Sequence, residues 1–160
     1  GEISCYPLTE NVHKDHRLHT SIAPAGDPQN IGDTAHAIAQ RILTALDYVG
    51  VMGVEFFELA GRQLIVNAIA PRVHNSGHWT QDAGCVDQFE QHIRAIAGWP
   101  LGDTQPQFSV TMTNLIGDEI LQKDTLAANL NTHVHDYDKR DIRAGRKMGH
   151  VNVVSTLMTQ

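Results

Sequence analysis

The sequence predicts an α+β fold in which most strands pair antiparallel. Two apolar runs, residues 51–57 and 63–69, flank a short connection that contains Gly61, and this spacing is typical of a β-hairpin. Residues 27–49 and 87–98 repeat apolar side chains every three or four positions, as amphipathic helices do. The last third of the chain consists of short strand-like runs around one helical stretch.

A strand is expected first at residues 2–6, and Asp15 lies in a polar stretch that predicts a turn between two further strands. The first helix should open at Asp27-Pro28, run to Val49 and end at Gly50. Its buried face is defined by apolar residues three or four positions apart. These residues are Ile31, Ala35, Ile38, Ile42 and Leu46.

Asp87 and Glu90 have the spacing of a capping box and predict the start of a second helix, which Gly98 and Pro100 should end. We expect this helix, which carries an apolar stripe, to have a structural role. The stripe consists of Phe89, Ile93 and Ile96.

Further strands are expected at residues 108–115, 133–137 and 147–154, around a helix at residues 121–130. Residues 101–106 form the best linker candidate, because the surrounding stretch has two prolines, a glycine and polar residues. The predicted division is therefore residues 1–100, a linker at 101–106, and a small strand-rich closing subdomain at 107–160.

The composition excludes several classes of protein. With 160 residues, 41% hydrophobic and 19% charged, the chain can bury one ordinary core. A net charge of −6 and 6% aromatic residues argue against general nucleic-acid binding. The sequence has no apolar run long enough to cross a bilayer, so we expect no membrane association and a cytoplasmic location. Cys5 and Cys85 lack the spacing of a zinc knuckle or a disulfide framework.

The most informative stretch, residues 65–80, runs from an apolar strand into a loop rich in cation, imidazole, amide and hydroxyl groups. Such a loop can hold an anion on a fixed backbone. Glu55 is the one carboxylate within the apolar run 51–57, and a buried acid needs a partner. The positive charges gather in a second stretch near the carboxy terminus. Five of the 12 Lys and Arg residues lie there: Lys139, Arg140, Arg143, Arg146 and Lys147.

Three runs carry a specific resemblance: Gly-Val-Glu-Phe-Phe at 53–57, Ala-Pro-Arg-Val-His-Asn-Ser-Gly-His-Trp-Thr at 70–80, and Arg-Ala-Gly-Arg-Lys-Met-Gly-His at 143–150. With residues 6–13 and 21–25 in the same order, the chain resembles the 5-(carboxyamino)imidazole ribonucleotide synthetases, ATP-grasp enzymes of purine biosynthesis. The resemblance implies the carboxy-terminal part of an ATP-grasp fold. It also implies a carboxy-terminal piece of a longer enzyme, inactive by itself.

The resemblance implies ATP, bicarbonate and 5-aminoimidazole ribonucleotide as partners and Mg²⁺ as a cofactor. A homodimer is compatible with it. Glu55 matches one magnesium ligand, and the second carboxylate is expected where this chain has Ala68. An alanine cannot coordinate a hard cation. An engineered change, a natural degenerate copy, or substitution by Glu58 would each account for the difference.

By the same resemblance, Arg72, His74 and Asn75 would surround bicarbonate, and Ser76 and Gly77 would let the backbone approach the substrates.

His78 and Trp79 are expected to pack beneath that loop. Lys139 and Arg146, with Lys147, would hold the ribonucleotide phosphate, and a solvated basic loop is the alternative.

Two histidine patterns are better explained without a metal. His13, His16 and His19 are three residues apart, but a turn at Asp15 would place them on strands rather than on one helix face. His133 and His135 share a strand face and are expected to support the basic turn.

The resemblance therefore predicts an ATP-dependent carbon–nitrogen ligase that carboxylates the ribonucleotide through carboxyphosphate. The alternatives are a catalytically silent ribonucleotide-binding module, favoured by Ala68, and an ATP-grasp ligase acting on another purine intermediate.

Overall fold

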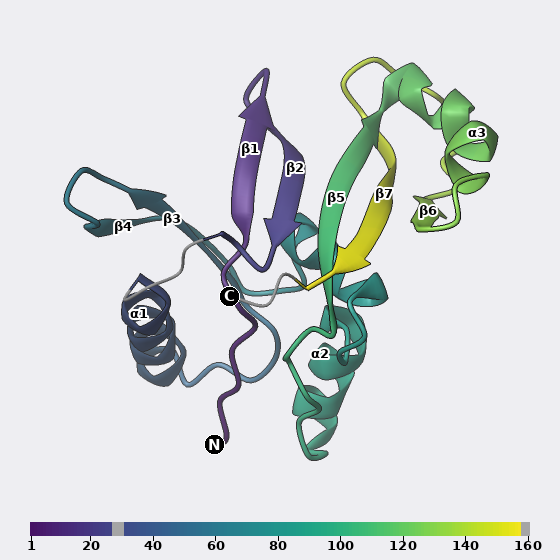
Figure 1. The fold of residues 1–160 in the computed structure, drawn as a ribbon. Helices are drawn as coiled ribbons and strands as arrows, with labels where there is room; N and C mark the ends of the chain where they lie inside the picture. The colour runs from purple at the N-terminus through teal and green to yellow at the C-terminus, as the bar shows by residue number, and fades with distance from the viewer. Residues whose placement is uncertain (27–30, 158–160) are drawn as a thin grey trace.

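A computed structural model describes residues 1–26 and 31–157. Five strands form one antiparallel sheet in the order β1-β2-β5-β7-β6, and β3 and β4 form a separate hairpin (Figure 1). The predicted α+β class with antiparallel pairing is confirmed. The strands of the sheet are β1 (Glu10–Lys14), β2 (Arg17–Ala23), β5 (Phe108–Ile116), β6 (Thr132–Asp136) and β7 (Lys147–Thr156).

The five-stranded sheet joins the two ends of the chain, because β2 pairs with β5. The segment before β5 has no regular structure but is anchored: the Val86 N–H donates to the Asp103 carbonyl at 2.9 Å, and the Gly102 N–H donates to the Gln91 side chain at 2.8 Å. The division at residues 101–106 stays a prediction.

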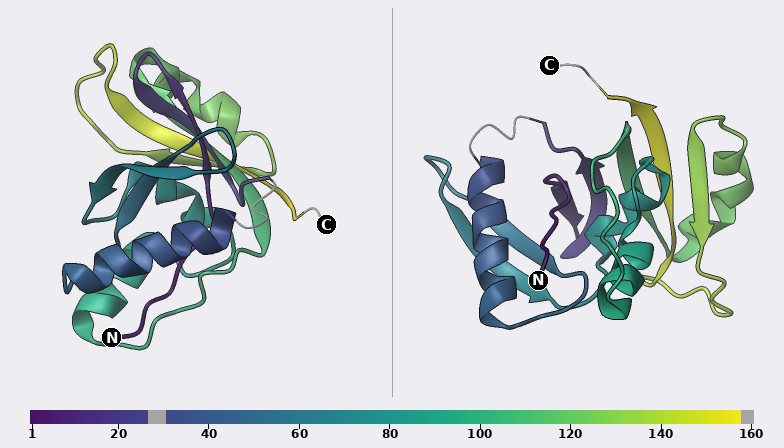
Figure 2. Two further views of the ribbon diagram at one scale, coloured as in Figure 1. Left: turned by 90° about the vertical axis from the view of Figure 1, so that its left-hand side faces the viewer. Right: turned by 90° about the horizontal axis from the view of Figure 1, so that it is seen from below.

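The predicted hairpin is confirmed as β3 (Gly53–Glu58) and β4 (Leu64–Ala70). Gly61 has φ = 76°, a conformation that favours glycine, which explains its place in the turn. The hairpin projects away from the sheet, and α1 (Ile31–Ala45) lies beside it (Figures 1 and 2). Glu55 lies three residues before the end of β3, away from the turn that contains Gly61.

Helix α1 ends earlier than predicted, at Ala45 instead of Val49. Asp47 adopts φ = 45°, and the Tyr48 N–H donates to the Leu43 carbonyl at 3.1 Å. This is a Schellman-type end formed without glycine, so Gly50 could not mark it. The predicted start at Asp27-Pro28 lies outside the described residues.

Helix α2 (Gln88–Ala97) has the predicted ends. The Asp87 carboxylate accepts the Phe89 and Glu90 N–H groups, and Gly98 closes the helix with φ = 68°. The expected stripe is largely exposed, with Ile93 at 51% and Ile96 at 55%. The side chains that α2 buries are two glutamines at its other face, Gln88 and Gln91.

Two expected elements are corrected. Residues 2–6 form no strand, because side-chain bonds rather than a ladder hold them, including Tyr6 Oη to the Val86 carbonyl at 2.7 Å. The helix expected at 121–130 is a 3₁₀ turn, η2 (Gly117–Gln122), followed by a short α3 (Lys123–Ala127). The Glu119 carboxylate accepts the Ile116 N–H at 2.7 Å, which starts the helical turns earlier than predicted.

Two apolar clusters support the sheet. One surrounds Trp79 and Met112, and the other surrounds Met148 and Val151. Trp79 belongs to η1 (Asn75–Asp82), a 3₁₀ helix where the sequence suggested a loop, and it packs beneath the site as expected. No helix of the described residues has the length and apolarity to span a membrane.

Candidate active site

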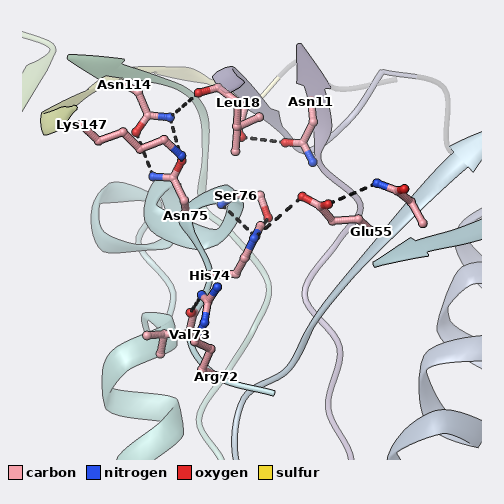
Figure 3. Close-up of polar contacts among 12 residues, drawn as sticks. Asn11, Leu18, Glu55, Arg72, Val73, His74, Asn75, Ser76, Asn114 and Lys147 are labelled. Atoms are coloured by element: carbon pink, nitrogen blue, oxygen red, sulfur yellow. Dashed lines mark hydrogen bonds and ion pairs between the residues drawn. The ribbon is translucent and has the colours of Figure 1, made fainter. Parts of the chain in front are cut away.

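Glu55 lies on β3 opposite Ala68 of β4, in register. Its side chain is half-buried, and one carboxylate oxygen, Oε1, lies 3.8 Å from His74 Nε2. The Asn67 amide approaches the other oxygen at 3.5 Å (Figure 3). The acid therefore faces the loop that carries the predicted anion-binding residues.

His74 is held in one tautomer by Ser76. The Ser76 N–H donates to Nδ1 of His74 at 3.3 Å, and the Ser76 hydroxyl lies 2.8 Å from the same nitrogen. A neutral imidazole that accepts at Nδ1 carries its proton on Nε2. Burial lowers the pKa of His74 against the opposing effect of Glu55, and Arg72 and Lys147 lower it further. His74 is thus a neutral donor whose Nε2–H faces Glu55.

Lys147 brings a cation to the same centre from the start of β7. Its Nζ donates to Asn75 Oδ1 at 2.6 Å. Burial lowers the pKa of Lys147, Lys139 lowers it further, and Glu55 acts in the opposite direction. Each of the three groups Glu55, His74 and Lys147 therefore lies within the electrostatic reach of at least one other.

Asn75 does not present a free amide. Its Nδ2 donates to Asn114 Oδ1 at 2.9 Å, while its Oδ1 accepts from Asn114 Nδ2 and from Lys147. Arg72 is exposed, and its guanidinium donates to the Val73 carbonyl at 2.8 Å (Figure 3). The predicted trio of Arg72, His74 and Asn75 is adjacent, but only His74 directs a polar atom toward Glu55.

Ser76 and Gly77 form the first turn of η1. A Cβ on Gly77 would lie 2.6 Å from Gln88 Oε1, so this glycine is explained by close packing as well as by the predicted substrate approach. Gln88 itself brackets His74: its Oε1 accepts the His74 N–H at 2.8 Å, and its Nε2 donates to the His74 carbonyl at 2.9 Å.

The basic turn between β6 and β7 divides into two parts. Lys139 Nζ donates to the Lys147 carbonyl at 2.5 Å and lies 5.1 Å from the centre of the Tyr137 ring. Arg146 donates to the Asp141 carbonyl at 3.2 Å, and Arg143 pairs with the Asp141 carboxylate at 2.9 Å. Lys139 and Arg146 thus hold the turn, while Lys147 reaches the Glu55–His74 centre.

Stacked rings connect β6 and β7 to η1 and α2. The rings of His135 and His150 are 4.4 Å apart, those of His150 and His78 are 4.8 Å apart, and Phe89 follows His78 at 5.6 Å. Tyr137 Oη lies 2.9 Å from His150 Nδ1. We define the four stacked rings as the histidine column.

Asp82 anchors one end of the column. His135 Nε2 lies 2.7 Å from one of its oxygens, and His133 Nδ1 lies 3.4 Å from the other. The expected support of the basic turn by these two histidines is therefore wrong: on β6 they contact η1. Across residues 1–26 and 31–157, no group of three or more His, Cys, Asp or Glu side chains could hold a metal ion.

A cleft of about 1020 Å³ opens beside Glu55. Its walls come from the amino-terminal segment, α1, the β3–β4 hairpin and η1, and Glu55, Asn67, His74 and Ser76 lie on its lining. This volume accommodates a nucleotide-sized ligand.

The donor set does not match a two-carboxylate magnesium site. Ala68 occupies the position opposite Glu55, so the pair supplies one carboxylate. Glu58 is three residues further along β3, or about 10 Å at the rise of a strand, which makes it a poor substitute. The role of Glu55 as a magnesium ligand stays a prediction.

Three polar residues near the site were not predicted: Gln88 and Asn114, which are buried, and Asp82, which is partly buried. Asn114 carried a usable signal, because it falls in the buried register of a strand whose other members there are Val110 and Met112. Gln88 and Asp82 carried none that we recognise, since one is adjacent to a helix cap and the other follows a polar loop.

Comparison with known proteins places these features in a family. Residues 1–89 match the ATP-grasp domain, and residues 110–160 match the phosphoribosylaminoimidazole carboxylase C-terminal domain. The N5-carboxyaminoimidazole ribonucleotide synthase of Brucella melitensis is 50% identical over 151 residues, which are 94% of this chain and 42% of that protein. The synthase of Vibrio cholerae is 46% identical over 155 residues, covering 97% of this chain and 40% of that protein.

Solved structures of proteins with related names also match this chain. The N5-carboxyaminoimidazole ribonucleotide synthetase of Thermus thermophilus matches with a TM-score of 0.90 and 43% identity, over 97% of this chain and 42% of that one. The Aspergillus clavatus synthase, solved in complex with ADP and 5-aminoimidazole ribonucleotide, gives a TM-score of 0.89 and 34% identity, over 96% and 43%. The chain thus spans about two fifths of the length of the relatives it matches. Because the ATP-grasp match covers more than half of its residues, the chain belongs to the ATP-grasp family.

Proposed function

We propose that this chain is part of an ATP-dependent carbon–nitrogen ligase that joins bicarbonate to the exocyclic amine of 5-aminoimidazole ribonucleotide. Mg²⁺ is the proposed cofactor. The observation that carries the proposal is the convergence of Glu55, the Nε2–H of His74 and the ammonium of Lys147 on one polar centre beside a nucleotide-sized cleft. Relatives named N5-carboxyaminoimidazole ribonucleotide synthase match 94% and 97% of the chain.

The proposed reaction has two steps. A bicarbonate oxygen attacks the γ-phosphorus of ATP, the bond to ADP breaks, and carboxyphosphate forms. The ribonucleotide amine then attacks the carbonyl carbon, phosphate leaves, and the amine loses a proton. Neither step needs a covalent bond to the protein, so positioning and charge stabilisation account for the catalysis.

His74 and Lys147 suit the first anion. A neutral Nε2–H donates to a bicarbonate oxygen without carrying a charge that would have to be neutralised, while the Lys147 ammonium offsets negative charge as carboxyphosphate forms. Arg72 is exposed next to His74, and its guanidinium would have to leave the Val73 carbonyl to add a second cation.

The basic turn suits the ribonucleotide phosphate. Lys139 and Arg146 lie on the turn that leads into Lys147 at the start of β7, so a phosphate bound there would lie near the residue that reaches the Glu55–His74 centre. Arginine supplies a planar fork and lysine a point charge for the phosphate oxygens.

The comparisons favour the ligase over a silent binding module, since the relatives are named as synthases. Ala68 is the observation that favours the silent binding module. Placing a carboxylate at position 68 distinguishes the two proposals.

The test is isotope transfer. A fusion of this chain to the preceding residues of the Brucella melitensis relative, with Ala68→Glu, should consume ATP only with both the ribonucleotide and bicarbonate present. With ¹⁸O-labelled bicarbonate, one labelled oxygen should appear in the released phosphate. ATP consumption without label transfer would contradict the acyl-phosphate route, and no consumption would contradict the ligase.

A further inference from the structure

Asn114 is a buried amide on β5 that contacts the candidate site through Asn75. It is fully buried and pairs with His150 across the β5–β7 ladder. A buried amide is costly unless its hydrogen-bonding groups find partners. Asn114 finds a partner for each of them.

The partners fix which way the Asn114 amide points. Its Nδ2 donates to the Leu18 carbonyl on β2 at 2.9 Å and to Asn75 Oδ1 at 2.7 Å. A carbonyl can only accept, so the nitrogen of Asn114 must face Leu18. The remaining atom, Oδ1, accepts from Asn75 Nδ2 at 2.9 Å.

The orientation of Asn114 determines that of Asn75, which in turn determines where Lys147 binds (Figure 3). With Asn114 fixed, Asn75 must turn its Oδ1 toward Asn114 Nδ2, and that same oxygen accepts from Lys147 Nζ at 2.6 Å. A flipped Asn75 would present an amide NH₂ to the ammonium, which has no acceptor lone pair to offer. The backbone of β2 thus selects the position of a side chain on β7.

We propose that Asn114 is a positioning residue that holds the Lys147 ammonium beside His74 by fixing the orientation of the Asn75 amide. The functional consequence rests on the proposed ligase reaction, because Lys147 acts on the developing carboxyphosphate there. Lys147 is half-buried and would otherwise have the freedom of a long flexible side chain. Three amide hydrogen bonds replace that freedom with one location.

Asn114→Asp is the informative substitution, because it keeps the shape and removes both N–H donors. The Leu18 carbonyl loses its partner and Asn75 Oδ1 keeps only Lys147. The carboxylate oxygen that takes the place of Asn114 Nδ2 repels both of these oxygens, so the Asn75 amide is no longer held in one orientation. Lys147→Met removes the positioned group itself. If Asn114 acts through Lys147, the two changes together should cost no more than Lys147→Met alone.

The experiment is a double-mutant cycle in the Ala68→Glu fusion. We expect Asn114→Asp to lower kcat at least about tenfold, with KM for ATP nearly unchanged, and to have no effect once Lys147 is replaced by methionine. Met112→Ala is the matched control on the same buried face of β5: it should lower Tm, and its effect on kcat should be the same with lysine or methionine at position 147. Multiplicative effects of Asn114→Asp and Lys147→Met, or an unchanged kcat, would overturn the proposal.

A second variant and readout protect the test. Asn114→Ser is too short to reach Asn75 and should repeat the non-additivity if the aspartate variant does not fold. In the 160-residue chain itself, the ¹³Cε resonance of Lys147 followed against pH should titrate at a different pH in Asn114→Asp and at the wild-type pH in Met112→Ala. Identical Lys147 titrations in the wild type, Asn114→Asp and Met112→Ala would overturn the positioning role, whether or not the fusion is active. An inactive fusion would instead count against the proposed ligase activity.

Discussion

Glu55 and Ala68 are register partners in the β3–β4 hairpin. Directly opposite residues of an antiparallel pair have Cβ atoms about 4.5–5.5 Å apart, so two carboxylates at these positions would reach one cation. The backbone therefore has a geometry that suits two carboxylates, while the side chain at position 68 is a methyl group. We expect a glutamate at position 68 to need no backbone change.

Ala68→Glu in the fusion enzyme should tighten magnesium-dependent ATP binding and raise turnover. The new carboxylate supplies both a ligand and a negative charge, and lost transition-state electrostatics of this kind costs about 3–4 kcal/mol, or two to three decades in rate. Turnover measured against magnesium concentration checks this. Ala68→Gln is the matched control, because it has the same length without the charge. Equal rates and equal magnesium dependence with alanine and with glutamate at position 68 would contradict a two-carboxylate site.

Replacing Lys139 or Arg146 by alanine should weaken ribonucleotide binding by about 1.5–3 kcal/mol, the range of charge-assisted hydrogen bonds. Both cations lie on the turn next to Lys147. Calorimetric titration with the ribonucleotide measures the effect in the fusion enzyme. Arg143→Ala is the control within the same turn, since Arg143 is already paired with Asp141. If all three variants bind as the parent does, the turn is a solvated basic loop.

Local patterns predicted the hairpin and the caps of α2, because turn glycines and capping carboxylates act on neighbouring residues. The end of α1 was missed because Asp47 adopts a left-handed conformation that its sequence does not announce. The periodicity of α2 identified an apolar face but not whether anything covers it, and that face is largely exposed.

The site shows the same limit. His74 and Lys147 are far apart in the chain and were each identified from a local motif, but the residues that orient them come from elsewhere. Gln88 brackets His74 from α2, and Asn114 orients Asn75 from β5. Such contacts depend on tertiary packing, and local sequence patterns do not reveal which distant residues meet.

Gly77→Ala should destabilise the 160-residue chain by about 1–3 kcal/mol, the usual cost of overpacking. The new methyl would lie 2.6 Å from Gln88 Oε1, and Gln88 is nearly fully buried and bonded on both sides of His74, so it cannot give way. Urea unfolding checks the prediction. Gly26→Ala is the control, because nothing lies within 4 Å of its added Cβ. Similar losses for both variants would contradict a tight Gly77–Gln88 contact.

The histidine column should make the fold sensitive to acid. Burial lowers the pKa of His78 to about 4, with Lys147, His135 and His74 lowering it further. Burial also lowers the pKa of His150 to about 3, with His78 and His135 adding to the effect and Asp82 opposing it. Tyr137, Gln88 and Phe89 face these rings without charge near neutral pH. Among the described residues His150 Nε2 has no hydrogen-bond partner, so the column offers no acceptor for a second proton there.

The sign follows from the two states. The unfolded imidazoles bind protons near pH 6.5, whereas the folded ones stay neutral until about pH 4 and about pH 3. The stability that these two neutral rings contribute is therefore fully present above pH 6.5. Between pH 6.5 and the folded pKa of each ring, the free energy of unfolding falls by about 1.4 kcal/mol per pH unit for that ring. Asp82 stays ionised across this window, because hydrogen bonds from His135 and Asn152 outweigh the effect of burial and lower its pKa. Unfolding free energies from urea titrations between about pH 7.5 and about pH 4.5 measure how steeply stability depends on pH. His78→Gln, whose side chain can still accept from Gln88, should reduce this slope by about half. A flat profile, or an unchanged slope in His78→Gln, would show that the column does not titrate with folding.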